Sequence, residues 1–263
     1  MRVWRLELEY EGTRYAGWQA QPHARTVQGE LAKAAEQFLG ARAEVGGSGR
    51  TDAGVHALRQ VAHLRSKLRG RAPDPAQLKA GLNKLLPHDV NVLRVAAARP
   101  DFHARHDALG RYYVYQIAAR RTAFGKPFVW WVRDSLDVRA MKEASRLVEG
   151  RHDFSSFCES PAEQRSTLVE VARAELAAEG GLVLFRIGAS HFLWKMVRRL
   201  VGALVEVGRA NLSPEEFGAL LHSYSNAPAA WTAPPSGLFL ERVLYEGDEP
   251  PGPLRAPFPL SAA

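Results

Sequence analysis

The amino-terminal segment alternates regularly between apolar and polar side chains. Over residues 3–10 every second position is apolar, and these positions are Trp4, Leu6, Leu8 and Tyr10. An alternation of period two places such side chains on one face of an extended chain. The pattern predicts a half-buried β-strand at the start of the protein.

Apolar residues then recur at helical spacing in two segments, each preceded by residues that start helices. The first segment follows Thr26, which can cap a helix, and the second follows Asp74 and Pro75. Three further strands are predicted at residues 43–46, 60–65 and 89–96. The first part of the chain is therefore expected to have the order βαββαβ.

The second part of the chain repeats this order of elements. Strands are predicted at residues 111–118, 167–177, 182–188 and 238–245, and helices at residues 138–148 and from His191 onward. An additional helix is predicted at Ser213-Pro214-Glu215-Glu216, where a capping serine, a proline at the first helical position and a glutamate at the third coincide.

The order of elements indicates an α+β fold built from two ferredoxin-like, split βαβ halves, with antiparallel or mixed sheets backed by helices. We expect the first half to span residues 1–105 and the second to span residues 106–246. Residues 247–263 are rich in proline and are expected to lack regular structure. An active-site cleft is expected between the halves.

Composition describes an ordinary globular protein. With 263 residues, 46% of them hydrophobic, the chain can bury a substantial core. It contains no apolar run of eighteen residues, and its first ten residues do not resemble the core of a signal peptide. The single cysteine, Cys158, excludes an internal disulfide and is expected to be a buried apolar group. These features predict a cytoplasmic location.

Positive charge is concentrated in one segment of the chain. The formal net charge is +7, and residues 99–133 contain seven basic residues but only two acidic ones, Asp101 and Asp107. Tyrosine, phenylalanine and tryptophan are interleaved with these basic residues. Basic groups neutralise phosphates and aromatic faces stack on bases. The segment is therefore either an RNA-binding surface or a solvated basic surface over core aromatics, and the pattern does not decide between them.

A glycine-rich loop at residues 46–56 carries the strongest candidate chemistry. Its glycines permit tight turns and close approach to a ligand. A phosphate-binding loop is disfavoured, because the lysine of a Walker motif is missing and a strand follows the loop. A tight hairpin, in which Asp52 caps local backbone amides, is the plain structural alternative.

The string Gly49-Arg50-Thr51-Asp52-Ala53-Gly54-Val55-His56 resembles the signature of the tRNA pseudouridine synthase A family. Further matches in the family's order extend over nearly the whole chain. They include Tyr10-x-Gly-x-x-Tyr15-x-Gly17-Trp18-Gln19, Gln60-Val61-x-His63, Phe102-His103-Ala104-Arg105, Tyr113-x-Tyr115-x-Ile117, Met196-Val197-Arg198 and Ala233-Pro234-Pro235-x-Gly237-Leu238. Arg59 is a departure, since the family usually has glycine there.

The resemblance implies an enzyme that isomerises uridine to pseudouridine in the anticodon arm of tRNA, at positions 38, 39 and 40. It also implies a homodimer, and we expect neither a cofactor nor a metal. The bond from ribose C1′ to uracil N1 breaks and a bond from C1′ to C5 forms, so atoms are neither added nor lost and no redox cofactor is required. A carboxylate can begin this reaction by direct attack or by assisting elimination.

The same resemblance assigns roles to individual residues. Asp52 is the essential carboxylate, and Tyr113 stacks on the target uracil. We favour Arg198 as the ion-pair partner that keeps Asp52 charged and Arg50 as a residue that positions RNA. Leu238, with Phe239, is a candidate for closing the uracil pocket. Strand parity alone does not separate Tyr113 from Tyr115, because both would lie on one face.

Other basic residues are candidates for holding the RNA backbone. Arg105 and Arg111 are expected to contact phosphates. In a helix that begins at His191, the side chains of His191, Lys195, Arg198 and Arg199 would share about one third of the circumference. This predicts a basic face for RNA, with a solvated charged face as the alternative.

Two rival hypotheses remain. A noncatalytic RNA-binding or RNA-chaperone protein would use the same basic and aromatic residues but would not need Asp52. A phosphate-dependent ribosyl transferase would require a small-molecule cosubstrate at the glycine-rich loop. His56 and His63 are expected to be ordinary hydrogen-bonded histidines, because no third ligand is clustered with them in the sequence.

Overall fold

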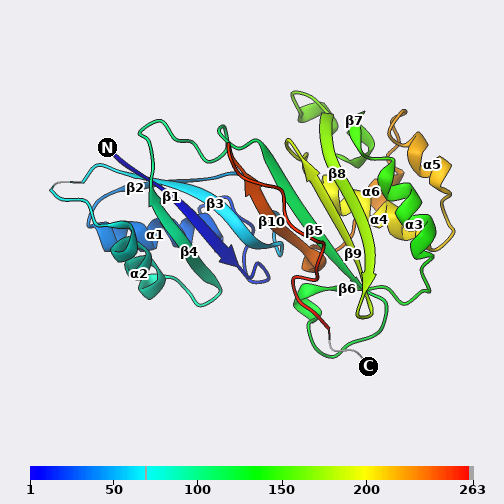
Figure 1. Cartoon of the computed structure of the whole chain (residues 1–263), viewed down its shortest axis with the longest axis horizontal. Helices are drawn as coiled ribbons and strands as arrows, with labels where there is room; N and C mark the ends of the chain where they lie inside the picture. The colour runs from blue at the N-terminus through cyan, green and yellow to red at the C-terminus, as the bar shows by residue number, and fades with distance from the viewer. Residues whose placement is uncertain (69, 261–263) are drawn as a thin grey trace. The chain divides into compact units, whose positions relative to one another are not determined.

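The computed structural model describes residues 1–68 and 70–260 (Figure 1). The chain forms two compact units, residues 1–109 with 240–248 and residues 110–239 with 249–263. Strand β10 (Leu238–Leu244) is divided between them, because its first two residues belong to the second unit. The predicted α+β class is confirmed, and each unit is consistent with a split βαβ half.

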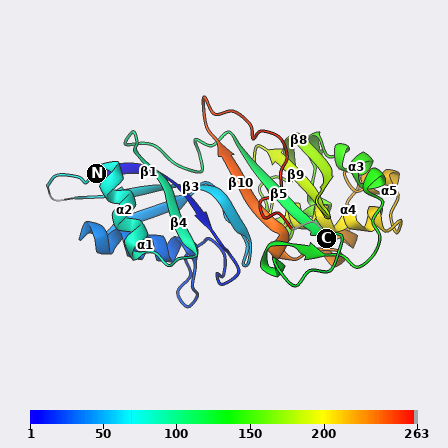
Figure 2. The same ribbon diagram turned by 60° about the horizontal axis from the view of Figure 1, so that its bottom comes forward.

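The first unit has the predicted order βαββαβ. Its strands are β1 (Arg2–Tyr10), β2 (Ala43–Gly47), β3 (His56–Ser66) and β4 (Val90–Ala97), and its helices are α1 (Val27–Leu39) and α2 (Pro75–Leu85). The strands pair antiparallel, with β1 between β4 and β3, and with β2 on β3. Helices α1 and α2 lie side by side in both views (Figures 1 and 2). The predicted apolar face of β1 is buried throughout.

The second unit is built around an antiparallel sheet with the order β5-β9-β8-β7. These strands are β5 (Gly110–Ala118), β7 (Gly150–Asp153), β8 (Leu168–Glu179) and β9 (Leu182–Ala189). The short strand β6 (Trp130–Trp131) pairs parallel with β5. Neither β6 nor β7 was predicted from the sequence pattern.

Helices gather on one side of β8 and β9 in this unit (Figure 1). They are α3 (Val138–Arg146), α4 (Met196–Gly208), α5 (Pro214–Ala219) and α6 (Ala227–Ala230). The part of this unit that the structure describes also contains the short 3-10 helices η1 (Lys126–Phe128), η2 (Ser155–Phe157), η3 (Pro161–Glu163) and η4 (Pro235–Gly237).

The predicted helix starts follow from local side-chain caps. The Thr26 hydroxyl accepts a hydrogen bond from the backbone amide of Gly29. Asp74 and Ser213 each form a capping box with the residue three positions later, and proline occupies the first turn of both helices. Such caps stabilise a helix by about 1 kcal/mol each. They explain why these three starts could be predicted from the sequence.

The helix expected from His191 begins at Met196 instead, so that prediction was wrong. Lys195 has a φ of 60°, in the left-handed region, which a right-handed helix cannot include. Residues 191–193 have no regular structure, and residues 194–195 form a turn directly before α4. The expected face shared by His191, Lys195, Arg198 and Arg199 does not exist as one helical surface.

The carboxy-terminal tail lacks regular structure through residue 260, as predicted, but it is held firmly to the second unit. Arg186 donates hydrogen bonds to the carbonyls of Gly252 and Pro253. The amide of Phe258 donates to the side chain of Gln116 at 3.0 Å. Leu260 belongs to the apolar core of this unit. Residues 261–263 of the predicted tail lie outside the described residues.

Candidate active site

The glycine-rich loop runs from the end of β2 to the start of β3, and Asp52 lies near its middle. Asp52 is partly exposed, whereas Thr51 and Val55 are buried. The backbone amide of Val55 donates to the carbonyl of Asp52 at 3.2 Å, and the amide of Trp18 donates to the carbonyl of Thr51 at 3.1 Å. The backbone is therefore fixed on both sides of the carboxylate.

A buried network of polar side chains lies beneath the loop. The Tyr10 hydroxyl is 2.8 Å from the Thr51 hydroxyl. The amide group of Gln60 donates to the carbonyl of Gly49 at 3.1 Å, and its oxygen accepts from the Ser48 hydroxyl at 2.7 Å. Burial raises the pKa of Tyr10 to about 12, so its phenol stays protonated at neutral pH. The network holds residues 48–51 to strands β1 and β3.

The segment that follows β1 supports the loop from another direction, through two close backbone approaches. A Cβ atom at Gly12 would lie 2.0 Å from the carbonyl oxygen of Val55. Gly17 has a φ of +94°, and a Cβ atom there would lie 2.6 Å from the carbonyl oxygen of Thr51. Both positions therefore require glycine. This explains the spacing of the Tyr10 to Gln19 motif.

The two candidate histidines of this unit have backbone partners. Nδ1 of His56 accepts from the amide of Gly12 at 3.0 Å, and Nδ1 of His63 accepts from the amide of Ala104 at 3.1 Å. Both side chains are buried. Within residues 1–68 and 70–260, no group of three His, Cys, Asp or Glu side chains is arranged to hold a metal ion.

The structure separates the two tyrosines that strand parity left equivalent. Tyr115 is fully buried, and its hydroxyl donates to the carbonyl of Pro234 at 2.7 Å. Burial raises the pKa of Tyr115 well above its usual value. Tyr113 is also buried, but 8% of its surface is exposed, and its ring packs edge to face against Phe192 with 4.9 Å between centroids. Tyr115 therefore has a structural role, which leaves Tyr113 as the better candidate for binding a base.

Arg198 and Leu238 are linked by the segment between them. Nε of Arg198 donates to the carbonyl of Ala233 at 2.7 Å, and the amide of Ala233 donates back to the carbonyl of Arg198 at 3.0 Å. Leu238 and Phe239, which follow this segment, are buried. The arrangement fixes one edge of the Arg198 guanidinium. Its predicted pairing with Asp52 stays a prediction.

The remaining basic candidates differ in exposure. Arg50, Arg105 and His191 are exposed, whereas Arg111 is buried and donates to the carbonyl of Ser190 at 2.8 Å. Arg199 is also buried, and its guanidinium bonds to the Glu159 carboxylate and to the carbonyl of Cys158. These contacts give Arg111 and Arg199 structural functions, and the RNA contacts of all five residues stay predictions.

Glu159 and Cys158 complete this arrangement around Arg199. Lys195 donates to the Glu159 carboxylate at 3.0 Å. Lys195 and Arg199 together hold the pKa of Glu159 below its usual value. Cys158 is buried, as predicted, and burial raises the pKa of its thiol. The cluster joins η2 to the beginning of α4.

Sequence reasoning did not identify the network formed by Tyr10, Ser48, Thr51 and Gln60. A signal was present, because Tyr10 lies on the apolar face of its strand and Gln60 opens a family motif. It also missed the contact in which the Tyr15 hydroxyl donates to Asp89 while the Arg25 guanidinium stacks over the Tyr15 ring. That contact joins residues distant in sequence, so no local pattern indicates it.

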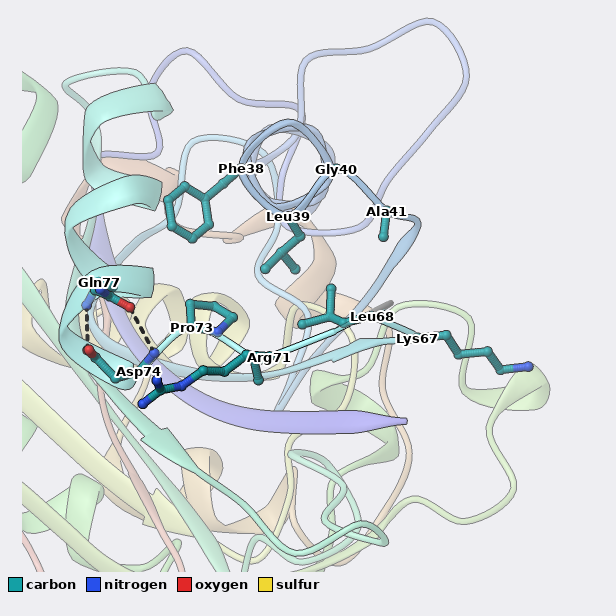
Figure 3. A pocket seen from close by; sticks show the side chains of 11 residues that line it. Phe38, Leu39, Gly40, Ala41, Lys67, Leu68, Arg71, Pro73, Asp74 and Gln77 are labelled. Atoms are coloured by element: carbon teal, nitrogen blue, oxygen red, sulfur yellow. Dashed lines mark hydrogen bonds between the residues drawn. The ribbon is translucent and has the colours of Figure 1, made fainter.

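A cavity of about 840 Å³ also lies in the first unit, away from the loop (Figure 3). It is lined by the end of α1, the start of α2 and the segment before α2, and Figure 3 shows Asp74 and Gln77 bonded to each other at its wall. These two residues form the helix cap. Since none of the lining residues belongs to the glycine-rich loop, we do not assign the cavity to the candidate active site.

Within residues 1–68 and 70–260, the structure contains no helix long and apolar enough to cross a membrane.

Comparison with known proteins matches the chain over most of its length. A family model described as tRNA pseudouridine synthase matches residues 8–107 and 144–246. The tRNA pseudouridine synthase A of Geobacillus kaustophilus is 41% identical over 92% of this chain and 93% of its own length. The tRNA pseudouridine synthase A of Moorella thermoacetica is 41% identical over 92% of this chain and 98% of its own length. The enzyme of the same name from Aquifex aeolicus is 40% identical over 91% of this chain and 98% of its own length. The chain belongs to the tRNA pseudouridine synthase family.

Proposed function

We propose that the protein isomerises uridine to pseudouridine in tRNA, with Asp52 as its essential carboxylate. The observation that carries this proposal is the position of Asp52 within the family's signature sequence, in the loop between β2 and β3. The residue is partly exposed, and the backbone before and after it is hydrogen-bonded. A reactive carboxylate needs access to substrate together with a fixed position, because small displacements reduce the rate strongly.

The reaction sets a short list of requirements for the protein. The C1′–N1 bond breaks, the freed base turns, and a C1′–C5 bond forms while the C5 proton leaves. No atom of the uridine is gained or lost except the exchanged proton, so the proposal includes no redox cofactor. Asp52 begins the sequence by attack at C1′ or by assisting elimination. In the proposal Tyr113 stacks on the uracil and Arg198 keeps Asp52 ionised.

The proposal also covers which uridines are modified, the oligomeric state and the location in the cell. The family resemblance favours uridines 38, 39 and 40 of the anticodon arm, a homodimer and a cytoplasmic location. A uridine in a base-paired stem must leave its stack to be modified, at a cost of a few kcal/mol. Stacking on an aromatic ring and contacts from arginine to phosphates supply energy of this size.

The deciding experiment is tritium release from tRNA labelled at uracil C5, with no metal or cofactor added. The wild type is expected to release tritium from the anticodon arm, and Asp52→Ala is expected to release none while binding tRNA with similar affinity. Asp101→Ala, which changes an exposed aspartate of the same unit, is the matched control and should retain full activity. If Asp52→Ala loses only tRNA binding, or if the wild type releases no tritium, the noncatalytic RNA-binding alternative is favoured.

A further inference from the structure

The basic and aromatic segment at residues 99–133 divides into two parts in the structure. The tyrosines at positions 112, 113 and 115 are buried in β5. After β5 ends at Ala118, the chain forms an outward loop that returns to the sheet in β6. We call residues 119–133 the basic loop. Here about half of the side chains are exposed, in contrast to the buried tyrosines of β5.

Phe124 lies near the tip of the basic loop and is the most exposed large apolar side chain of the described residues, with 83% of its surface accessible. Trp131, at the base of the loop, is 42% exposed, and the Arg121 guanidinium lies 5.9 Å from its ring centroid. Both rings are therefore open to a partner, and the Trp131 ring with the Arg121 guanidinium beside it offers a face suited to stacking.

The loop holds Phe124 outward by specific contacts. The Thr122 hydroxyl donates to the carbonyl of Phe124 at 2.8 Å and accepts from its amide at 3.1 Å. Next, Gly125 has a φ of +73°, which turns the chain back into η1. The exposure of Phe124 therefore follows from an ordered backbone turn.

The base of the loop is attached to the core and to the tail of the second unit. The Gln116 amide group donates to the carbonyl of Phe128 at 2.9 Å, and the Ser236 hydroxyl donates to the carbonyl of Val129 at 3.2 Å. The rings of Phe128 and Phe258 lie 4.6 Å apart between centroids. A loop fixed in this way loses little conformational entropy when it binds a partner.

Charge indicates what kind of partner the loop fits. Residues 119–133 contain four basic residues and no acidic one. The nearest acidic residue along the chain, Asp134, is paired with Arg209 at 2.8 Å. A surface with net positive charge and exposed aromatic rings is complementary to a phosphate backbone with an accessible base.

We propose that the basic loop is an RNA-binding surface, on which Phe124 stacks against an unpaired or terminal base while Arg121 and Lys126 contact the adjoining phosphates. The proposal rests on the proposed function, since tRNA supplies the RNA. It adds an RNA-binding surface outside the residues that the family resemblance assigns to the reaction. The occupant is single-stranded RNA within the substrate, and not a second copy of the protein.

The test measures the affinity of Asp52→Ala protein for tRNA, so that binding is separated from turnover. Adding Phe124→Ala is expected to raise the dissociation constant by roughly 5- to 150-fold, the range for removing one base stack, while Phe124→Trp retains affinity. The double change Arg121→Gln and Lys126→Gln should lower the slope of log affinity against log salt by about 0.7 for each phosphate that the loop no longer neutralises.

Two exposed residues of the same unit provide matched controls. Tyr224→Ala removes a ring that is 63% exposed, and Arg139→Gln removes an exposed guanidinium, so both should leave affinity and salt slope unchanged. The proposal would be overturned if Phe124→Ala left the affinity for tRNA unchanged. It would also be overturned if Tyr224→Ala lowered that affinity as much as Phe124→Ala does. A change of sedimentation mass in Phe124→Ala without a change in intrinsic RNA affinity would instead identify a protein interface.

The test distinguishes this proposal from the proposed function. Failure of the proposed function appears as no tritium release by the wild type, whatever the loop variants bind. Failure of the loop proposal appears as unchanged tRNA affinity in an active enzyme.

Discussion

The hydroxyl of Tyr10 lies 2.8 Å from the hydroxyl of Thr51, the residue directly before the proposed catalytic carboxylate. Both groups are buried, and the amide group of Gln60 lies 3.4 Å from the same tyrosine oxygen. Buried polar groups that are hydrogen-bonded to one another specify a single arrangement, since breaking any bond leaves an unsatisfied partner. The contact therefore connects strand β1 to the position of Asp52.

We expect Tyr10→Phe to reduce the turnover number while leaving the Michaelis constant for tRNA nearly unchanged. The substitution removes one oxygen beneath the loop and leaves the Thr51 hydroxyl with one partner fewer. The free energy of unfolding should fall by about 1–2 kcal/mol. Initial rates of tritium release and denaturant titrations measure the two effects.

Tyr224→Phe is the control for Tyr10→Phe, because it removes a hydroxyl from an exposed tyrosine of the other unit. It should change neither quantity. A Tyr10→Phe protein that loses stability but keeps its full turnover number would show that the network supports the fold without positioning Asp52.

Local chemistry determined which parts of the fold could be predicted. Thr26, Asp74 and Ser213 cap helices through bonds to residues three positions away, so the signal lies within a short window of sequence. Strand β1 could also be predicted, because only one of its faces is apolar and packs on the core, which gives the sequence its alternating pattern. In contrast, β6 has two residues and exists only because it pairs with β5, which no local pattern indicates.

In the candidate site, too, features with a local sequence signal could be predicted and features that depend on distant contacts could not. The signature string identified Asp52, but spacing alone placed Lys195 on a helix that begins one residue later. Helical spacing of basic residues describes a face only if the backbone is helical, and the left-handed φ of Lys195 interrupts it. Tyr113 and Tyr115 could be separated only by the hydroxyl contact of Tyr115 with Pro234, which lies 119 residues away in the sequence.

Stability should depend on pH through His63, which is only 2% exposed. Burial, together with the positive charge of Arg65 and the neighbouring His103, lowers the pKa of His63 to about 4, although Glu44 opposes the shift. The folded protein therefore keeps His63 neutral between pH 6.5 and about 4, where the unfolded chain binds a proton. Stability from this group is complete above pH 6.5 and decreases as the pH falls, by up to about 3 kcal/mol.

The free energy of unfolding at pH 7.5, 6 and 5 tests this dependence in the wild type and in His63→Asn. Asparagine offers an oxygen near the position of Nδ1 that can accept from the amide of Ala104, and it does not titrate. The loss of stability between pH 7.5 and 5 should be smaller in the variant. Equal losses in both proteins would assign the acid sensitivity to other groups.

The ion pair between Arg199 and Glu159 should contribute much more to stability than an exposed pair of the same unit. Arg199 is buried, so Glu159→Gln would leave its guanidinium without the carboxylate charge that offsets its desolvation. We expect the free energy of unfolding to fall by about 1–4 kcal/mol, because removing one partner of a buried pair strands the other. Glu143→Gln breaks the exposed pair with Arg139 and should cost less than about 0.5 kcal/mol.

Denaturant titration of both variants at low and high salt separates the buried pair from the exposed pair, since salt screens mainly the exposed pair. If Glu159→Gln is as mild as Glu143→Gln, Arg199 is not held by this carboxylate, and its predicted contact with RNA becomes the better explanation for its position.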